Sequence, residues 1–192
     1  MGVPYQREPG DEHTPWPPRV AVELRPAVPA DVAAVARIWR EGWCDAHLGH
    51  VPAALVAART PASFTERTRD RVADTIIAVR SGTVTGFAMT CGSEVDQLYL
   101  DRAARGGGIG ARLLDAAERV IFAAGHERAW LAVATGNTNA RRFYKRAGWI
   151  DDGSYSHEAP VPSGTVAVDC HRFLAPRRAL RQPFAVRGHP IT

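Results

Sequence analysis

The feature that most constrains this chain is a glycine-rich segment between an apolar run and an amphipathic one. Residues 98–111 read LYLDRAARGGGIGA, and from there apolar residues recur at helical spacing, at Ile109, Leu113, Ala117, Val120 and Ile121. This order predicts a strand, a short loop and a helix that begins at the glycines. A helix N-terminus leaves backbone N–H groups unpaired, and glycines let a phosphate approach them closely. The segment therefore predicts a diphosphate-binding loop.

Two common phosphate-binding loops do not fit this segment. The P-loop ends in Gly-Lys-Ser/Thr, whereas Ile109-Gly110-Ala111 stands here. The dinucleotide fingerprint G-x-G-x-x-A is matched in spacing by Gly106, Gly108 and Ala111, but it requires the glycines directly after a strand and an acid at the end of the next strand. Here five residues intervene, and the next predicted strand, Trp130–Ala134, ends without an acid. What remains is strand, loop, R-x-x-G-x-G and helix.

A second informative block is NTNARRFYKRAGW, residues 137–149. Either Asn137 or Asn139 is suited to cap a helix, and Gly148 is suited to end it before an aromatic residue that leads into a strand. Taken singly, Phe143 and Tyr144 are typical of core packing.

These two blocks, in this order and with a strand between them, resemble the GNAT superfamily of N-acyltransferases over about residues 20–174. Asn137, Tyr144, Gly148 and Trp149 match the family's second block. The resemblance implies a single α/β domain, with a mixed sheet of about six or seven strands flanked by helices. It also implies that acetyl-CoA is the acyl donor, and it places the cofactor-binding residues at Leu98, Tyr99, Leu100, Arg105, Gly106, Gly107, Gly108, Ile109, Gly110, Ala111, Asn137 and Arg141.

The chemistry of amine acetylation asks for two proton transfers. The incoming amine must lose a proton, since a free amine has a pKa of about 10, and the departing thiolate gains one. Glu94 lies eleven residues before Arg105, where several family members carry their general base, and Asp96 is the alternative. Tyr144 matches the family's general acid. Backbone N–H groups of the strand Leu98–Leu100 would polarise the thioester carbonyl.

The resemblance predicts an enzyme that moves an acetyl group to a primary amine, of a small molecule, by direct attack. Residues 41–68 resemble the segment that shapes the acceptor pocket of small-molecule members. The motifs describe the donor rather than the acceptor, so protein N-termini and lysines stay open as substrates. A non-catalytic acyl-CoA-binding or regulatory module is a further alternative. Cys91 as an acyl-carrying nucleophile is disfavoured, because no histidine partner is evident and a small buried residue is expected there.

Composition adds a few constraints. The length of 192 residues suits one domain, and no apolar run approaches the ~20 residues that span a bilayer. Three cysteines without metal-ligand spacing favour reduced thiols in a cytoplasmic protein, and His47 and His50 are expected to be surface or pocket-rim groups rather than metal ligands. The net charge of +4 comes from arginines spread along the chain, which makes nucleic acid an unlikely partner.

The chain divides into three parts by composition. Residues 1–19 are rich in proline and are expected to be a flexible extension, residues 20–174 form the acetyltransferase domain, and residues 175–192 form a basic tail. Exposed edges of the last strands make a homodimer plausible. Strands are predicted at Val20–Arg25, Thr75–Val79, Val84–Met89, Glu94–Leu100, Trp130–Ala134, Trp149–Ser156 and Thr165–Leu174. A basic cluster is grouped with the tail, namely Arg172, Arg177, Arg178, Arg181 and Arg187.

Overall fold

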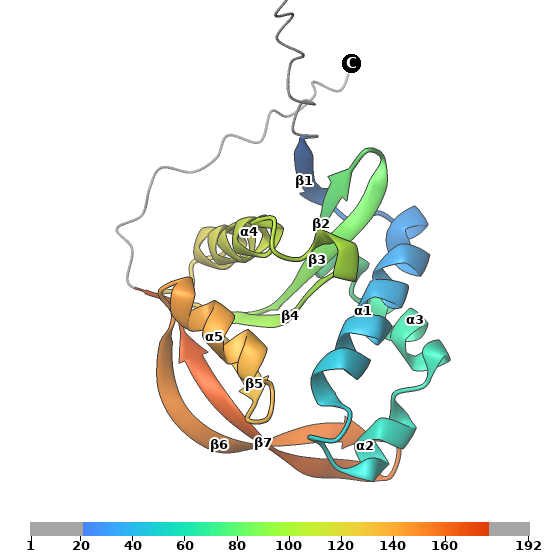
Figure 1. Ribbon diagram of the computed structural model, residues 1–192, viewed down its shortest axis with the longest axis vertical. Coiled ribbons are helices and arrows are strands. Elements are labelled where there is room, and N and C mark those ends of the chain that lie inside the picture. The colour runs from blue at the N-terminus through green and yellow to red at the C-terminus, as the bar shows by residue number, and fades with distance from the viewer. Residues whose placement is uncertain (1–20, 177–192) are drawn as a thin grey trace, which may run out of the picture.

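The structure is a computed structural model that describes residues 21–176, so the predicted N-terminal extension and nearly all of the basic tail lie outside the described residues. Seven strands form one sheet in the order β1-β2-β3-β4-β5-β7-β6 (Figure 1). Only β4 and β5 run parallel, so the predicted mixed sheet is confirmed. The strands are β1 (Val22–Pro26), β2 (Thr75–Arg80), β3 (Thr83–Cys91), β4 (Glu94–Leu100), β5 (Trp130–Ala134), β6 (Ile150–Val161) and β7 (Gly164–Leu174).

Helices cover both faces of the sheet, with α4 and α5 on one side and α1 to α3 on the other (Figure 1). They are α1 (Val32–His47), α2 (Ala53–Ala58), α3 (Pro61–Asp70), α4 (Ile109–Ala123) and α5 (Thr138–Arg146). Short 3₁₀ turns occupy Pro29–Asp31, Val72–Asp74 and Arg102–Ala104. Within residues 21–176, no helix combines the length and the apolar character that a membrane span requires.

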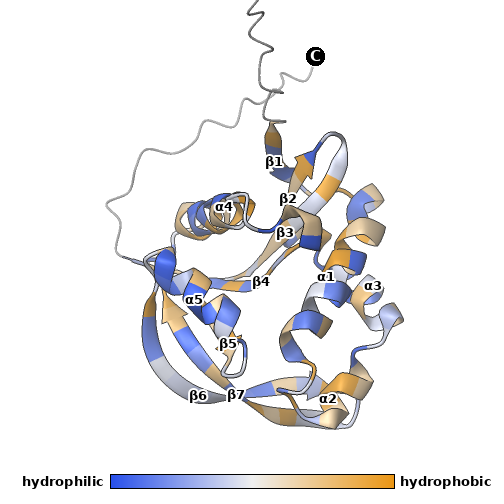
Figure 2. Cartoon of the chain, in the orientation of Figure 1, coloured by the Kyte–Doolittle hydropathy of each residue, from blue (hydrophilic) through white to orange (hydrophobic). Residues whose placement is uncertain are grey.

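Each face of the sheet carries its own hydrophobic core, because the helices are amphipathic. In α4 the predicted stripe is confirmed at four of its five positions, since Ile109, Leu113, Ala117 and Ile121 are buried on the side that packs against β2, β3 and β4. Val120 is an exception, because it is 46% exposed. In α1 the buried residues include Ile38 and Trp39, which face the opposite side of the sheet. Figure 2 shows apolar and polar residues alternating along both helices. One core holds α4, which begins at the glycine-rich loop, and the other holds α1, which lines the candidate site.

The strand predictions are confirmed for β4 and β5 residue by residue. The prediction that the strand after Gly148 ends at Ser156 is wrong, since β6 continues to Val161. It pairs with β7 down to Val161 opposite Gly164, so backbone pairing extends the strand through the segment HEAP, residues 157–160, whose composition does not favour a strand. This long hairpin reaches α2 at the far end of the molecule (Figure 1).

Strands β4 and β5 touch at one end only. Their register contains the single pair Glu94 and Trp130, and the backbone N–H of Trp130 donates to Ser93 at 3.0 Å. Beyond this pair the two strands separate, while β3 stays paired with the outer edge of β4 and β7 with the outer edge of β5. A parallel pair that opens in this way leaves the inner edges of both strands without a neighbouring strand. The candidate site occupies that opening.

Candidate active site

A cavity of about 330 Å³ lies where β4 and β5 separate. Its walls come from both strands, from the C-terminal half of α1, from α2 and α3, and from β6. Six of the residues considered for the site line it, namely Glu94, Asp96, Leu98, Tyr99, Asn137 and Tyr144. Leu100, the glycine-rich loop and Arg141 do not line it. The chain therefore brings residues from β4 and α5, far apart in sequence, to one hollow.

The glycine-rich loop has the conformation that a phosphate-binding loop needs. Gly106 and Gly108 have φ values of +82° and +80°, and a Cβ added at either would meet nothing within 4 Å. These positive φ values disfavour other residues, and the space above them is open. Gly108 is the N-cap of α4 and no side chain caps the helix, so the helix start offers its N–H groups. The loop therefore fits a diphosphate group.

Gly110 has a different role from the glycines before it. A Cβ at this position would lie 3.4 Å from Cδ1 of Leu100 and 3.4 Å from Cζ of Phe143. This glycine therefore lets α4 pack closely against β4 and α5. Close packing brings the glycine-rich loop next to the helix that carries Tyr144.

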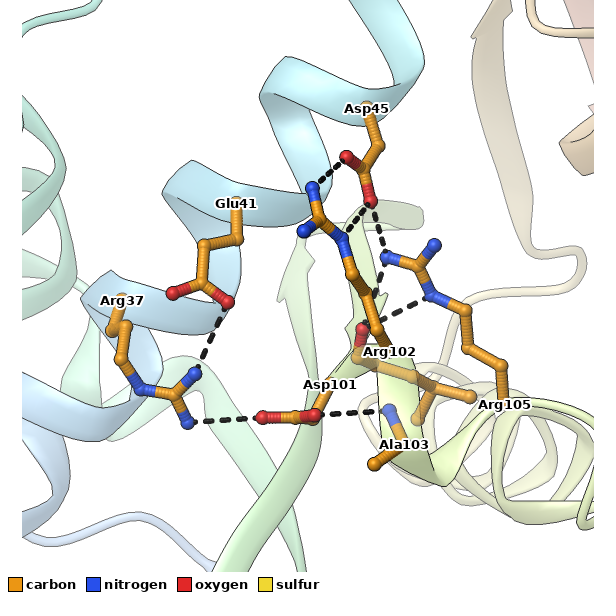
Figure 3. Close-up of polar contacts among 8 residues, drawn as sticks. Arg37, Glu41, Asp45, Asp101, Arg102, Ala103 and Arg105 are labelled. Carbon is orange, nitrogen blue, oxygen red and sulfur yellow. Dashed lines mark hydrogen bonds and ion pairs between the residues drawn. The ribbon is translucent and has the colours of Figure 1, made fainter.

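The loop before α4 is tied to α1 by a carboxylate that the sequence analysis missed. Asp45 accepts hydrogen bonds from both Arg102 and Arg105, with Nη2 of Arg105 at 2.9 Å from Oδ2 (Figure 3). These arginines, Arg102 foremost, lower the pKa of Asp45 to about 2. Arg105 also reaches the carbonyl oxygen of Leu100, with its Nε at 3.4 Å. Its guanidinium thus joins the loop, β4 and α1.

Both ends of α5 are fixed by capping, which positions Tyr144. Asn137 is the N-cap, and its Oδ1 accepts the backbone N–H of Ala140 at 3.1 Å, so the choice left open between Asn137 and Asn139 falls on Asn137. At the other end Gly148 has φ +85°. The N–H of Trp149 donates to the carbonyl of Tyr144 at 3.0 Å, as in a Schellman motif.

Tyr144 is both a core residue and part of the cavity wall. Its ring lies 5.0 Å from that of Phe143, 5.9 Å from Phe173 and 6.0 Å from Trp149, and the residue is 8% exposed. Burial raises the pKa of its phenol, so the hydroxyl is protonated at neutral pH. A protonated phenol at the edge of the cavity is able to donate a proton or a hydrogen bond into it.

A β-bulge places Glu94. The pairing of β4 with β3 skips Asp96, and this extra residue changes which face the residues before it occupy. Val95 therefore packs with Leu98 in the core under α4, while Glu94 shares with Tyr99 the face toward α1. Sequence alternation alone would put Glu94 on the face of Leu98. The bulge thus places Glu94 on the face toward α1, and Glu94 lines the cavity there.

The two carboxylates of β4 differ in their surroundings. Asp96 forms an ion pair with Arg71, 3.2 Å from Oδ2 to Nη1. Glu94 has no ion pair with any described residue within 21–176, and burial, followed by the charge of Asp96, raises its pKa to about 7. A carboxylate with a pKa near neutral is able to accept and release a proton at physiological pH.

Arg141 and Lys145 lie on α5, but both are engaged by Asp151 of β6. Nζ of Lys145 lies 3.2 Å from Oδ2 and Nη2 of Arg141 3.4 Å from the same atom, while Nδ1 of His171 lies 2.8 Å from Oδ1. Hydrogen bonds from His171 and Lys145 outweigh the effect of burial and lower the pKa of Asp151. Arg141 thus contacts the hairpin of β6 and β7, and its assignment to the cofactor site stays a prediction.

One further expectation is wrong. Cys91, expected to be buried, is exposed at the end of β3 and does not line the cavity. Arg172, counted with the basic cluster, lies in β7 as the strand prediction for Thr165–Leu174 implies. It pairs with Ala132 of β5, and its guanidinium lies 5.2 Å from the ring of Trp130 and 5.1 Å from that of Tyr155, in cation–π contact with both.

No group of three or more candidate metal ligands occurs among residues 21–176. Of the two histidines considered, His47 stacks on Trp43 at 4.8 Å and its Nδ1 lies 3.0 Å from the carbonyl oxygen of that residue. His50 packs against Gly136, where an added Cβ would lie 2.6 Å from the imidazole ring. His47 lines the cavity, whereas His50 is exposed and does not line it, so both rings are in the expected pocket-rim or surface positions.

Comparison with solved structures shows the same fold. A GCN5-related N-acetyltransferase from Rhodopseudomonas palustris has a TM-score of 0.60 and 24% identity, covering 78% of this chain and 93% of its own. The PaiA N-acetyltransferase from Thermoplasma acidophilum, solved in complex with coenzyme A, has a TM-score of 0.59 and 18% identity, covering 79% and 98%. The putative acetyltransferase YncA from Salmonella typhimurium, solved with acetyl-CoA, has a TM-score of 0.60 and 17% identity, covering 86% and 99%.

No curated protein matches the chain. The family model described as the acetyltransferase (GNAT) family matches residues 38–149, which include the end of α1, the whole glycine-rich loop and α5. This match spans more than half of the 192 residues. The chain belongs to the acetyltransferase (GNAT) family.

Proposed function

We propose that this protein transfers the acetyl group of acetyl-CoA to a primary amine in the cavity between β4 and β5. The observation that carries the proposal is that Glu94 and Tyr144 line this one cavity, where two parallel strands separate. One side chain is suited to take a proton near neutral pH, and the other is suited to give one.

The donor end of the site is built from backbone. The open glycines 106 and 108 and the uncapped start of α4 suit the pyrophosphate of acetyl-CoA. Two related structures contain coenzyme A or acetyl-CoA, which supports the same ligand here. The inner edge of β4 lacks a neighbouring strand beyond Glu94, so backbone groups of Leu98–Leu100 are available for the pantetheine arm and the thioester oxygen.

Acetyl-CoA, when bound, supplies a thioester carbonyl that an amine can attack, forming a C–N bond as the C–S bond breaks. In our assignment the carboxylate of Glu94 takes the proton that the amine nitrogen loses, directly or through a water molecule. The hydroxyl of Tyr144 gives its proton to the departing sulfur. Both groups start in the required protonation state at pH 7.5, because the pKa of Glu94 is about 7 and that of Tyr144 is raised above its usual range.

The test is an acceptor screen with two readouts. The protein is incubated with acetyl-CoA and a panel of primary amines, including polyamines, amino acids and short peptides. Free thiol is followed in solution, and the products are examined by mass spectrometry. We expect thiol release that depends on at least one amine, with an equal amount of acetylated amine. Tight acetyl-CoA binding with no amine-dependent release would instead support the non-catalytic acyl-CoA-binding module.

A further inference from the structure

The cavity wall holds two arginines that have no ion pair with a described residue. Arg59 follows directly after α2, and Arg67 lies in the last turn of α3. Both line the cavity that also contains Glu94 and Tyr99. Among residues 21–176, neither guanidinium lies within ion-pair distance of a carboxylate. Half-buried arginines are normally paired, so these two positions call for an explanation.

The contacts of these arginines hold them in place without neutralising them. Nη1 of Arg59 donates to the carbonyl oxygen of Pro160 at 3.2 Å, while its Nε is buried and has no hydrogen-bond partner. Arg67 lies over the ring of Trp39, 4.5 Å from the centroid. Burial and then the charge of Arg67 lower the pKa of Arg59 to about 10, so it remains charged at neutral pH. The positive charges of Arg59 and Arg67 thus line the same cavity and repel each other.

Three acids line the same cavity, Glu94, Asp96 and Glu158, and none of them forms an ion pair with either arginine. Asp96 is the carboxylate that acts on Arg67, but it is already bound by Arg71 at 3.2 Å. Glu158 lines the cavity and accepts a hydrogen bond from Thr165 at 2.8 Å. The positive charge of the two arginines is therefore left for a ligand. Since a guanidinium presents a planar fork of N–H donors, it suits a carboxylate or a phosphate group.

The remaining wall of this part of the cavity is apolar. Trp43, Val51 and Leu55 line it. A ligand here meets cationic groups, an apolar surface and the carboxylate of Glu94 within one cavity.

We infer that the acceptor is a small primary amine that also carries an anionic group, a carboxylate or a phosphate, which Arg59 and Arg67 bind while the amine faces Glu94. This inference rests on the proposed function and narrows its substrate class. It disfavours polyamines, because a polycation would meet two arginine charges. It also disfavours lysine side chains and N-termini of proteins, which have no anion of their own at a fixed short distance from the amine.

The experiment compares matched amines on the full-length protein with saturating acetyl-CoA. Each amino acid is tested beside its carboxamide and its decarboxylated amine, so that only the carboxylate changes. O-phosphoethanolamine beside ethanolamine tests the phosphate arm. Variants Arg59→Gln and Arg67→Gln are assayed with the same amines. Arg69→Gln is the control, since this residue lies on the same helix, is exposed and does not line the cavity.

We expect the anionic member of at least one matched set to be the better acceptor. Each of the two cavity variants should raise KM for that acceptor about 10- to 100-fold, as expected for loss of a charged hydrogen bond. The KM of acetyl-CoA and the rate with the matched amine that lacks an anionic group should stay near the wild-type values. Arg69→Gln should behave as wild type. Arg67→Lys, which keeps the charge and loses the fork, separates loss of recognition from loss of folding.

Three outcomes overturn the inference. If carboxamides and decarboxylated amines are acetylated as well as the acids, the acceptor needs no anion, although the proposed acetyl transfer stands. If an anionic acceptor is preferred but both glutamine variants keep its KM, other groups bind the anion. If no amine of any kind is acetylated, the proposed function fails and this inference fails with it. Circular dichroism and the melting temperature verify that each variant is folded.

Discussion

Arg71 holds Asp96, with 3.2 Å between Nη1 and Oδ2, and Glu94 stays the unpaired carboxylate of β4 among residues 21–176. The same guanidinium donates to the carbonyl oxygen of Thr90 at 2.6 Å, so it links the two strands on either side of the bulge. An ion-paired carboxylate is a weak proton acceptor, whereas a half-buried unpaired one is a better base. This difference separates the two candidates for the general base.

The first prediction concerns these two carboxylates. Glu94→Gln keeps the size of the side chain and removes its basicity, so the acetylation rate at pH 7 should fall about 10²-fold or more. Asp96→Asn should lower the acetylation rate far less, because the carboxylate of Asp96 is already ion-paired with Arg71. Steady-state kinetics of both variants decide the assignment. If Asp96→Asn is the more damaging change, the base is Asp96.

The second prediction concerns pH. Burial raises the pKa of Glu94 from its ordinary value near 4.5 to about 7. The folded protein therefore binds more protons than the unfolded chain between these values, and this group destabilises the fold progressively as the pH rises through that interval. Glu94→Gln should raise the melting temperature relative to wild type at pH 8 and have little effect at pH 4.5. The wild-type rate should also show an inflection near pH 7 that the variant lacks. Equal melting temperatures at pH 8 would show that the carboxylate is not desolvated.

The third prediction concerns the glycine-rich loop. Gly108→Asp introduces a side chain and a negative charge where φ is +80° and the space is open, so acetyl-CoA binding should be lost in titration calorimetry. Gly125 provides the control, since it follows the other end of α4 with φ +89° and equally open surroundings. Gly125→Asp carries a similar backbone cost of about 1–2 kcal/mol. It should lower stability and leave the affinity for acetyl-CoA unchanged. Equal loss of affinity in both variants would assign the effect to folding.

The fourth prediction concerns the phenol. Tyr144→Phe keeps the ring contacts with Phe143, Trp149 and Phe173, so stability and acetyl-CoA binding should change little. Turnover should fall about 10- to 10³-fold, because the departing sulfur loses its proton donor. With thioesters of more acidic thiols as donors, the variant should lose less of its turnover, because these thiolates leave more readily without a proton donor. A variant that unfolds, or that binds the donor poorly but turns over normally once loaded, would make Tyr144 a packing residue only.

The fifth prediction concerns the contact between α1 and β4. A Cβ added at Gly42 would overlap the ring of Tyr99, whose phenol lines the cavity. Gly42→Ala should therefore lower the free energy of unfolding by about 1–3 kcal/mol, as overpacking does. Arg40→Ala, at an exposed position of the same helix, is the control. Chemical denaturation measures the free energy of unfolding of both variants. Unchanged stability of Gly42→Ala would mean that the ring of Tyr99 moves aside at no cost.

Much of the fold follows from local sequence signals. The glycine-rich loop predicts the start of α4, because the apolar stripe that follows has helical spacing and the glycines precede it directly. Asn137 and Gly148 mark the two ends of α5 by ordinary capping chemistry. The exact limits of β4 and β5 follow from short apolar runs between turn residues. Each of these signals lies within a short stretch of sequence, so it can be recognised without knowing which distant segments come into contact.

Other features depend on contacts between distant segments and have no local signal. The bulge at Asp96 arises from the register with β3, so the face that Glu94 occupies could not be predicted from alternation. Asp45 looks like any exposed helical acid until the loop with Arg102 and Arg105 is brought beside it. The pair formed by Arg59, just after α2, and Arg67 of α3 can likewise be recognised only once both segments line one cavity.

The central claim is direct transfer of acetyl from acetyl-CoA to an amine within this cavity, and a single-turnover experiment with isotopically labelled acetyl-CoA tests it most directly. The enzyme in excess over donor is mixed with an accepted amine, quenched at intervals and analysed by mass spectrometry. The account predicts that label appears on the acceptor nitrogen at the rate at which free thiol appears, with none on the protein. Label that accumulates first on the protein, or that is released only as acetate, would contradict it.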